Sequence, residues 1–299
     1  MSPLVPPRVL NADDYAMSAG VSRGIEQLAA ARKISGTSAF VTLPRWQEDA
    51  PRIRELRGHI AIGLHLNLTV GSPAGPFASL APGGAFPALS DVIRATVLRK
   101  LVPGEVRDEI KRQLDLFETA LGHPPDHIDG HQHVHVLPIV RNQLIAEVAA
   151  RYHDHRPLMR DPTEGLAHIA TRSPAKGKAL IVRALAQGFR SLARRHGLPL
   201  NTSFYGFSAF DTERPFRAEM IDALDRRQDT APLKVVMCHP GFPDAELAAL
   251  DPITARRQQE YDALMQLGPP EAVIWHPADT RVDRPIPAWA AMADGRATA

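Results

Sequence analysis

The sequence predicts an α/β protein that folds as a distorted (β/α) TIM-like barrel, in a single domain covering residues 1–299. Short apolar runs alternate with helical patterns, which is typical of parallel βαβ units. Up to eight such runs occur in one chain, as a barrel requires. Polar motifs lie at or near the C-terminal ends of four of them, the ends at which barrel active sites are built. A doubly wound open sheet is the alternative fold.

The predicted strands are short and apolar on at least one face. They cover residues 8–12, 36–43, 59–68, 127–133, 157–160, 202–207, 233–238 and 272–275. In the third strand His65 and Asn67 share one face and leucines occupy the other, because side chains alternate along a strand. Asp129, His131 and His133 share a face of the fourth strand in the same way. These polar faces are expected to line the barrel mouth.

Helical patterns lie between most of the strands. They cover residues 21–33, 103–121, 139–152, 179–196, 217–227 and 254–267. Segment 72–101 is expected to be a loop-rich insertion over the mouth, and 290–299 a flexible tail. The helix at 179–196 combines an apolar stripe with several basic residues. It is interpreted as an outer barrel helix, with a membrane-surface helix as the alternative if the substrate is lipid-borne.

Composition limits the classes of function. Apolar residues make up 44% of the chain and charged residues 23%, and the formal net charge is +2. The basic residues are spread along the sequence, which excludes a nucleic-acid-binding footprint. A single cysteine allows no internal disulfide, which fits a reducing compartment. Neither a secretory signal nor a membrane-spanning run is visible, so a cytoplasmic protein is expected.

Asp13 and Asp14 follow the first predicted strand. As neighbours they would point to opposite faces of an extended strand, so both reach one site only if the strand ends between them and the chain turns. One carboxylate could then bind a metal ion while the other activates water. The alternative is a loop with two solvated acids.

Histidines supply the remaining candidate ligands. His65 lies on the polar face of the third strand, and several histidines lie between His127 and His135. Side chains two apart on one face lie about 6.6 Å from each other, so only one or two of these histidines can reach a single ion. Asp129 or His133 is expected to orient a ligand instead. A buried polar ladder without a metal is the alternative.

His239 follows the seventh predicted strand and precedes Pro-Gly, which marks a strand end. Cys238 should face away from it, so a Cys-His nucleophile pair is not expected, and Cys238 is interpreted as a small buried side chain. His276, at a similar strand end, is assigned no function. Ser22 lies in a G-x-S-x-G pattern, but no strand leads directly into it as a nucleophile elbow requires.

Together, these motifs resemble the YdjC-type carbohydrate deacetylases, a group that includes chito-oligosaccharide deacetylases and the hopanoid-biosynthesis deacetylase. The resemblance runs from about residue 8 to 280 and is carried by Asn-Ala-Asp-Asp at 11–14, Ile-Gly-Leu-His-Leu-Asn-Leu-Thr at 62–69, His-Ile-Asp-Gly-His-Gln-His-Val-His at 127–135 and Val-Met-Cys-His-Pro-Gly at 236–241. It is faint at 72–101 and 162–198. Tyr15-Ala16 stands where the family usually has Phe-Gly, which places a hydroxyl and a methyl group beside the expected sugar pocket.

The resemblance implies a distorted (β/α) barrel that removes an acetyl group from an N-acetylated amino sugar. By position, Asp14, His65 and His131 match the metal ligands, Asp13 the base and His239 the probable acid. One divalent ion, Zn²⁺ or Mg²⁺, is implied; two imidazoles and a carboxylate suit zinc better. Asp13 would take a proton from water and His239 would protonate the departing amine. The substrate is an oligosaccharide or a glycolipid, and the assembly is left open between monomer and homodimer.

A metal-dependent phosphoesterase or amidohydrolase on a similar barrel is the alternative enzyme, because His-x-His strands occur there too. Such sites often hold two ions, so one ion per chain would favour the deacetylase. A non-enzymatic sugar-binding relative is the third possibility. The roles of His133, His135 and Arg160 stay open at this point.

Overall fold

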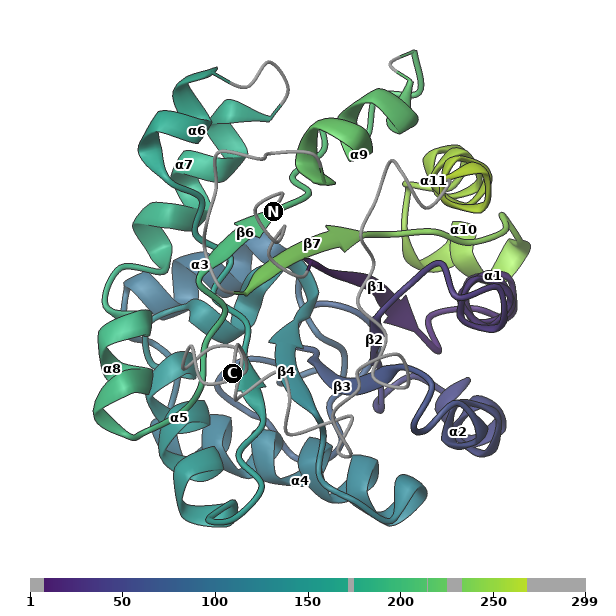
Figure 1. Ribbon diagram of the computed structural model, residues 1–299. Helices are drawn as coiled ribbons and strands as arrows, with labels where there is room; N and C mark the ends of the chain where they lie inside the picture. The colour runs from purple at the N-terminus through teal and green to yellow at the C-terminus, as the bar shows by residue number, and fades with distance from the viewer. Residues whose placement is uncertain (1–7, 172–174, 214, 225–232, 268–299) are drawn as a thin grey trace.

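Seven parallel strands form one curled sheet at the centre of the computed structural model (Figure 1). The structure describes residues 8–171, 175–213, 215–224 and 233–267. The strands are β1 (Arg8–Tyr15), β2 (Gly36–Ala39), β3 (Ala61–Leu66), β4 (His127–Gly130), β5 (Leu158–Met159), β6 (Ser203–Tyr205) and β7 (Lys234–Cys238). Their order in space is β5-β4-β3-β2-β1-β7-β6, and neighbouring strands pair in parallel.

The two edges of the sheet approach each other between β5 and β6. There the Met159 N–H donates to the Pro199 carbonyl at 2.8 Å, and Met159 forms an isolated parallel bridge with Leu200. The sheet therefore curls toward closure instead of staying open as in a doubly wound fold. This confirms the predicted distorted TIM-like barrel. The predicted strand at 272–275 lies outside the described residues.

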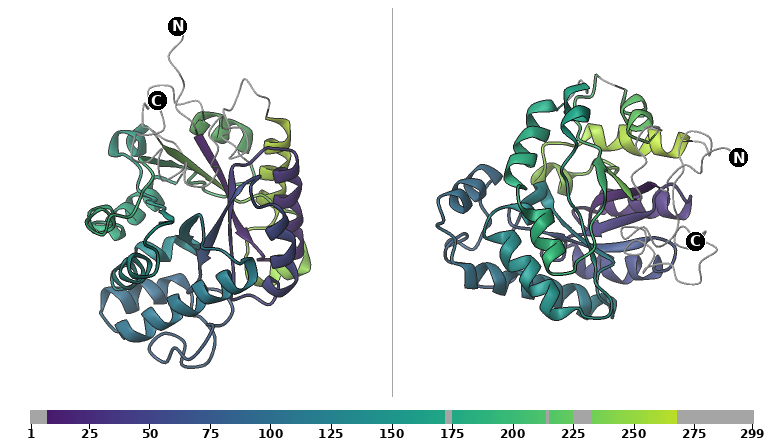
Figure 2. Two further views of the ribbon diagram at one scale, coloured as in Figure 1. Left: turned by 60° about the horizontal axis from the view of Figure 1, so that its bottom comes forward. Right: turned by 60° about the vertical axis from the view of Figure 1, so that its left-hand side comes forward.

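Helices surround the outside of the sheet (Figures 1 and 2). They are α1 (Ala19–Ala30), α2 (Trp46–Glu55), α3 (Leu89–Val97), α4 (Pro103–Leu121), α5 (Val140–Arg151), α6 (Leu166–Thr171), α7 (Lys176–Leu185), α8 (Phe189–Arg195), α9 (Phe216–Leu224), α10 (Ala245–Leu250) and α11 (Ala255–Gln266). A 3₁₀ turn, η1 (His131–Val136), follows β4. Helix α4 shows why the longer elements were predictable: Pro103 begins it, left-handed Gly122 (φ 77°) ends it, and Val106, Ile110 and Phe117 are buried at helical spacing.

Most predicted strands differ from the observed ones by one or two residues at an end, and three differ by three or more residues at their C-terminal ends. The first strand does not end near Ala12 but continues to Tyr15, while the second is shorter than predicted and ends at Ala39. The fourth ends at Gly130, and the residues after it form η1. The extended prediction to His133 was therefore wrong. Two successive residues with positive φ, Gln132 (51°) and His133 (62°), turn the chain away from the sheet.

The single helix predicted at 179–196 is two helices, α7 and α8. Gly188, with φ 89°, separates them, because a left-handed residue cannot continue a right-handed helix. Helices α2, α3, α6 and α10 were not predicted. The sequence shows no clear helical pattern for α2, because Pro51 lies within a strongly charged segment. Trp46 and Ile53 of this segment are buried.

Segment 72–101 lies between β3 and α4. Residues 72–88 contain neither helix nor strand, and 89–97 form α3. Residues 290–299 lie outside the described part of the chain. Within the described residues, no helix combines the length and the apolar character needed to cross a membrane.

Candidate metal centre and the surrounding cavity

A bulge in β1 brings two neighbouring carboxylates to one cavity. The register between β1 and β2 shifts between Ala12 and Tyr15, and Asp14 has a φ of 74°. An extra residue in a strand re-aims the side chains around it, so Asp13 and Asp14 both line the same cavity. The expected end of the strand between them was wrong, because the chain turns by a bulge within β1.

His65, on β3, points toward Asp14. Its Nε2 lies 3.0 Å from Asp14 Oδ1, and both side chains are buried. The preceding glycine on the same face is required by packing, because a Cβ on Gly63 would lie only 2.4 Å from Nε2 of buried His127. The alternation predicted for this strand therefore places His65 as expected.

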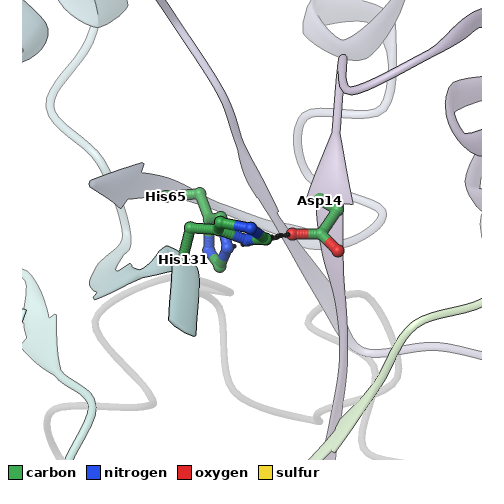
Figure 3. A group of neighbouring side chains, drawn as sticks. All are labelled: Asp14, His65 and His131. Atoms are coloured by element: carbon green, nitrogen blue, oxygen red, sulfur yellow. Dashed lines mark hydrogen bonds and ion pairs between the residues drawn. The ribbon is translucent and has the colours of Figure 1, made fainter. Parts of the chain in front are cut away.

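His131 reaches the same carboxylate from the first residue of η1. Its Nδ1 lies 3.1 Å from Asp14 Oδ1. Figure 3 shows the two imidazoles approaching Asp14 from one side. One ligand atom from each of Asp14, His65 and His131 lies within 4.8 Å of the others. Groups more than a hundred positions apart in the sequence thus converge at one point.

The hydrogen bonding of His65 leaves room for a cation. Its Nδ1–H donates to Asp129 Oδ1 at 2.6 Å, so in the neutral ring Nε2 carries a lone pair. This lone pair faces Asp14 Oδ1, which is also an acceptor, and Nε2 has no hydrogen-bond partner. Two facing acceptors require a proton or a metal ion between them. Burial alone would lower the pKa of His65, but Asp129 and Asp14 raise it to about 10.

The buried charges around this point also favour a bound cation, because negative groups outnumber positive ones. Three buried carboxylates, those of Asp13, Asp14 and Asp129, face two buried guanidinium groups, those of Arg160 and Arg257. With neutral imidazoles the cluster lacks one positive charge. A divalent cation or a proton on an imidazole would supply it, so the donor set fits a metal ion.

Arg160 joins two of the carboxylates. Its guanidinium donates to both oxygens of Asp13, at 2.7 and 2.8 Å, and its Nη1 lies 2.8 Å from Asp129 Oδ2. His135 fixes the backbone of this residue, because its Nε2–H donates to the Arg160 carbonyl at 2.8 Å. Asp129 therefore links Arg160 to His65.

Arg257, on α11, was missed by sequence reasoning. Its Nη2 lies 2.7 Å from Asp14 Oδ2 and 2.6 Å from Asp251 Oδ2. Burial alone would raise the pKa of Asp14, but Arg257 and the two imidazoles hold it well below its usual range. In the sequence Arg257 is one of two adjacent arginines on a polar helix, a pattern that normally indicates solvent exposure.

A cavity of about 640 Å³ opens over these groups. Asp13, Asp14, His65, His131, His239 and Arg257 line its polar end. The remaining wall is largely apolar, and about half of its residues come from two helices. Its apolar residues include Leu89 and Ile93 on α3 and Ile181, Val182 and Leu185 on α7.

His239, after β7, lines the cavity beside the cluster. Its backbone N–H donates to Glu260 Oε2 at 2.5 Å, and its ring packs edge-on against Phe210 with centroids 5.3 Å apart. Burial lowers the pKa of His239 to about 4, although Asp14 and Asp13 act in the opposite direction. Cys238 is buried against β1, with Sγ 3.4 Å from the Asn11 carbonyl, as expected for a small core side chain.

The other candidate residues that the structure describes are held by ring packing or by hydrogen bonds. His133 lines the cavity, and its ring packs edge-on against Phe207 with centroids 5.3 Å apart. Ser22 lies in α1, and its hydroxyl donates to Asp49 at 2.6 Å, so it is not on a nucleophile elbow. His276 lies outside the described residues.

The Tyr15-Ala16 departure does not reshape the cavity. The Tyr15 hydroxyl donates to Glu26 at 2.8 Å, and neither Tyr15 nor Ala16 is among the lining residues. Ala16 instead carries a backbone cost, because its φ of 65° favours glycine.

Comparison with known proteins extends over most of the chain. A carbohydrate deacetylase from Mus musculus is 31% identical over 247 residues, which cover 79% of this chain and 78% of the mouse protein. A chitooligosaccharide deacetylase from Serratia marcescens is 28% identical over 241 residues, covering 80% of this chain and 83% of that protein.

Solved structures show the same fold. The crystal structure of an Enterococcus faecalis V583 protein proposed to cleave cellobiose phosphate superposes with a TM-score of 0.65 at 22% identity, covering 87% of this chain and 91% of that one. The family model described as YdjC-like protein matches residues 9–271. This span includes every residue of the candidate metal centre, and the chain belongs to the YdjC-like family.

Proposed function

We propose that this protein is a metal-dependent hydrolase that removes the acetyl group from an N-acetylated amino sugar and releases acetate. The observation that carries the proposal is the approach of His65 Nε2 and His131 Nδ1 to one Asp14 oxygen, at 3.0 and 3.1 Å, at the polar end of the cavity. The deacetylase names of the mouse and Serratia relatives support the substrate class.

Asp14, His65 and His131 would hold one divalent ion, and the two imidazoles favour Zn²⁺ over Mg²⁺. When bound, such an ion supplies Lewis-acid chemistry, polarising an amide carbonyl and lowering the pKa of a nearby water. Asp129 keeps His65 in the tautomer that presents Nε2, through the 2.6 Å hydrogen bond to Nδ1.

Asp13 is the proposed general base. Arg160 donates to both of its oxygens and Asn11 Nδ2 donates to Oδ1 at 2.8 Å, so the carboxylate is held in one orientation. Oδ1 accepts both of these donors, whereas Oδ2 accepts only from Arg160 and keeps a lone pair that can accept a proton from water.

His239 is the proposed general acid toward the departing amine. Since burial lowers its pKa to about 4, the ring is neutral before the reaction. The proton that it donates must therefore reach it during the cycle, and the proton that Asp13 removes from water is available. Asp13 and His239 line the same cavity, which suits this transfer.

The cavity wall favours a glycolipid over an oligosaccharide. A chain of sugars would place many hydroxyl groups against the aliphatic side chains of α3 and α7, and these side chains offer no hydrogen bonds. An amino sugar attached to an apolar group would place its acetamide at the polar end and its apolar part between the helices. The volume of about 640 Å³ suits a ligand larger than one sugar ring.

Acetate release tests the proposal. We expect turnover of an alkyl N-acetylglucosaminide, with slower turnover of diacetylchitobiose, loss of activity with chelator and recovery when Zn²⁺ is returned. Turnover that survives complete removal of metal, or that Asp13→Asn leaves intact, would contradict the proposed chemistry. Faster turnover of diacetylchitobiose would contradict the glycolipid only.

A binuclear phosphoesterase or amidohydrolase is the rival. Asp13, His65 and Asp129 also offer ligand atoms within 4.8 Å of one another. Arg160 Nη1, however, lies 2.7 Å from Asp13 and 2.8 Å from Asp129, and so supplies the positive charge that a second ion would bring. We therefore expect one metal ion per chain. Two ions, together with hydrolysis of a phosphate ester, would favour the rival.

A further inference from the structure

We propose that the surface formed by α3, α7 and residues 98–102 docks on an anionic lipid surface; we call it the α3/α7 face. The inference goes beyond the proposed reaction, since it concerns where the cavity opens. Its test measures binding and requires no turnover.

Exposed apolar side chains gather on this face. Among the described residues, eight large apolar side chains are exposed, and five lie on α3, on α7 or at residues 98–102. Val97 and Leu98 are each 57% exposed, Leu180 48% and Ile181 58%. Val102 completes the set. Such a concentration on one part of the surface marks an interaction site.

Basic residues accompany these side chains. Residues 89–102 and 176–185 contain six lysines and arginines and one acid, Asp91, whereas the whole chain has 35 basic and 33 acidic residues. Arg94 pairs with Asp91. Arg99 and Lys100 are exposed beside Leu98. Aliphatic side chains with lysines and arginines around them are typical of helices that lie at a lipid interface.

The same two helices form the wall of the cavity. Ile93 on α3 and Ile181 on α7 line it, and Ile181 is also exposed at the surface. Figure 1 shows both helices on the left-hand side of the molecule. Docking through this face would bring this part of the cavity wall to the lipid surface, so an apolar substrate group could enter without crossing water.

Charge complementarity selects the lipid surface among the possible occupants. A second copy of this chain would bring an equally basic face to this one, and the two would repel each other. A neutral lipid surface would leave the excess positive charge without a partner, whereas anionic headgroups attract it.

Sedimentation of the full-length protein with vesicles tests the proposal. We expect at least about tenfold stronger binding to phosphatidylcholine vesicles that contain phosphatidylglycerol than to phosphatidylcholine alone, and weaker binding as salt is raised. No binding, or equal binding to both at all salt concentrations, overturns it. An Asp14→Asn variant should bind as the unmodified protein does, which separates docking from the proposed metal site.

Paired variants locate the surface. Leu98→Gln with Leu180→Gln should weaken vesicle binding several-fold, whereas Leu116→Gln with Met265→Gln, which changes exposed apolar side chains on α4 and α11, should not. Arg99→Gln with Lys100→Gln should also weaken vesicle binding several-fold. Arg54→Gln, at an exposed arginine elsewhere on the surface, is the control for this variant. Equal binding by the test and control variants overturns the proposal. Self-association that the Leu98/Leu180 pair abolishes assigns the face to a second copy and overturns it too.

Discussion

Two acidic clusters meet at His65, and they differ in what neutralises them. The first cluster is Asp14 with His65 and His131, and one of its oxygens faces two imidazole nitrogens. The second is Asp13 with Asp129, and Arg160 lies between them within hydrogen-bond distance of both. Similar carboxylates can therefore have different roles, because one cluster contains a guanidinium between its carboxylates and the other could hold a metal ion.

This difference explains how adjacent aspartates can act separately. Arg257 compensates only part of the charge on Asp14, since its Nη2 also contacts Asp251. Asp13 is held on both oxygens by Arg160. The bulge in β1 directs the two side chains to these different partners. Variants of both clusters test this division between a cluster that could hold an ion and a cluster that Arg160 neutralises.

The largest effect should follow removal of a ligand from the first cluster. His131→Ala should lower acetate release by about 10³-fold and reduce bound metal below one ion per chain, because the Lewis-acid contribution of several kcal/mol is lost. Metal analysis and acetate assays measure the two effects. His155→Ala, at an exposed histidine, should change neither. Full metal content in His131→Ala would remove His131 from the ligand set.

Removing the cation of the second cluster should mainly affect stability. Arg160→Met should lower the free energy of unfolding by about 3–5 kcal/mol, since Asp13 and Asp129 would remain buried without their partner. Arg94→Met, which breaks an exposed pair with Asp91, should cost about 1 kcal/mol or less. Urea unfolding measures both. Equal losses for the two variants would show that Arg160 does not neutralise the cluster.

Glu260 sharpens the comparison, because it is a buried carboxylate without a close cation. Its Oε1 lies 3.9 Å from Arg256 Nε, and burial raises the pKa of Glu260 to about 7. A folded-state pKa above the unfolded value stabilises the protein at low pH, and this contribution is lost as pH rises from about 4.5 to 7. As pH rises from about 4.5 to 7, the free energy of unfolding should therefore fall less in Glu260→Gln than in the unmodified protein, by on the order of 2 kcal/mol.

Unfolding measured at several pH values for both proteins checks this. The difference between the two curves isolates Glu260 from the buried histidines, which titrate in both. Parallel curves between pH 4.5 and 7 would mean that Glu260 ionises normally in the folded protein.

The smallest effect concerns the aliphatic wall. Ile93→Gln should raise the KM for an alkyl N-acetylglucosaminide by about tenfold while leaving kcat and the KM for methyl N-acetylglucosaminide nearly unchanged, because only the apolar part of the substrate contacts this wall. Leu98→Gln, which does not line the cavity, is the matched control in detergent-free assays with a short alkyl chain. Equal KM changes for both substrates would place the sugar, and not its apolar group, against α3.

Much of the fold and several site residues were predictable from local pattern. The alternation of apolar and polar residues placed His65 on the inner side of β3, and the βαβ sequence indicated a barrel whose strands end at one rim. Both inferences depend on periodicity within a few residues, and burial of one strand face imposes that periodicity directly. The bulge at Asp14, the turn at Gln132 and His133, and the break at Gly188 could not be predicted in this way, since each depends on one or two positive-φ residues within an otherwise regular pattern.

The sequence by itself determined which chemical groups are present and which strand ends carry them. Only the tertiary structure decided their partners: Arg257 with Asp14, Arg160 with Asp13 and Asp129, and His131 with the same oxygen as His65. Asp14 and Arg257 are 243 positions apart, and their contact depends on how α11 packs against α1 and α9. Local periodicity carries no information about such pairs, because the energy of a buried charge depends on the groups that the completed fold places around it.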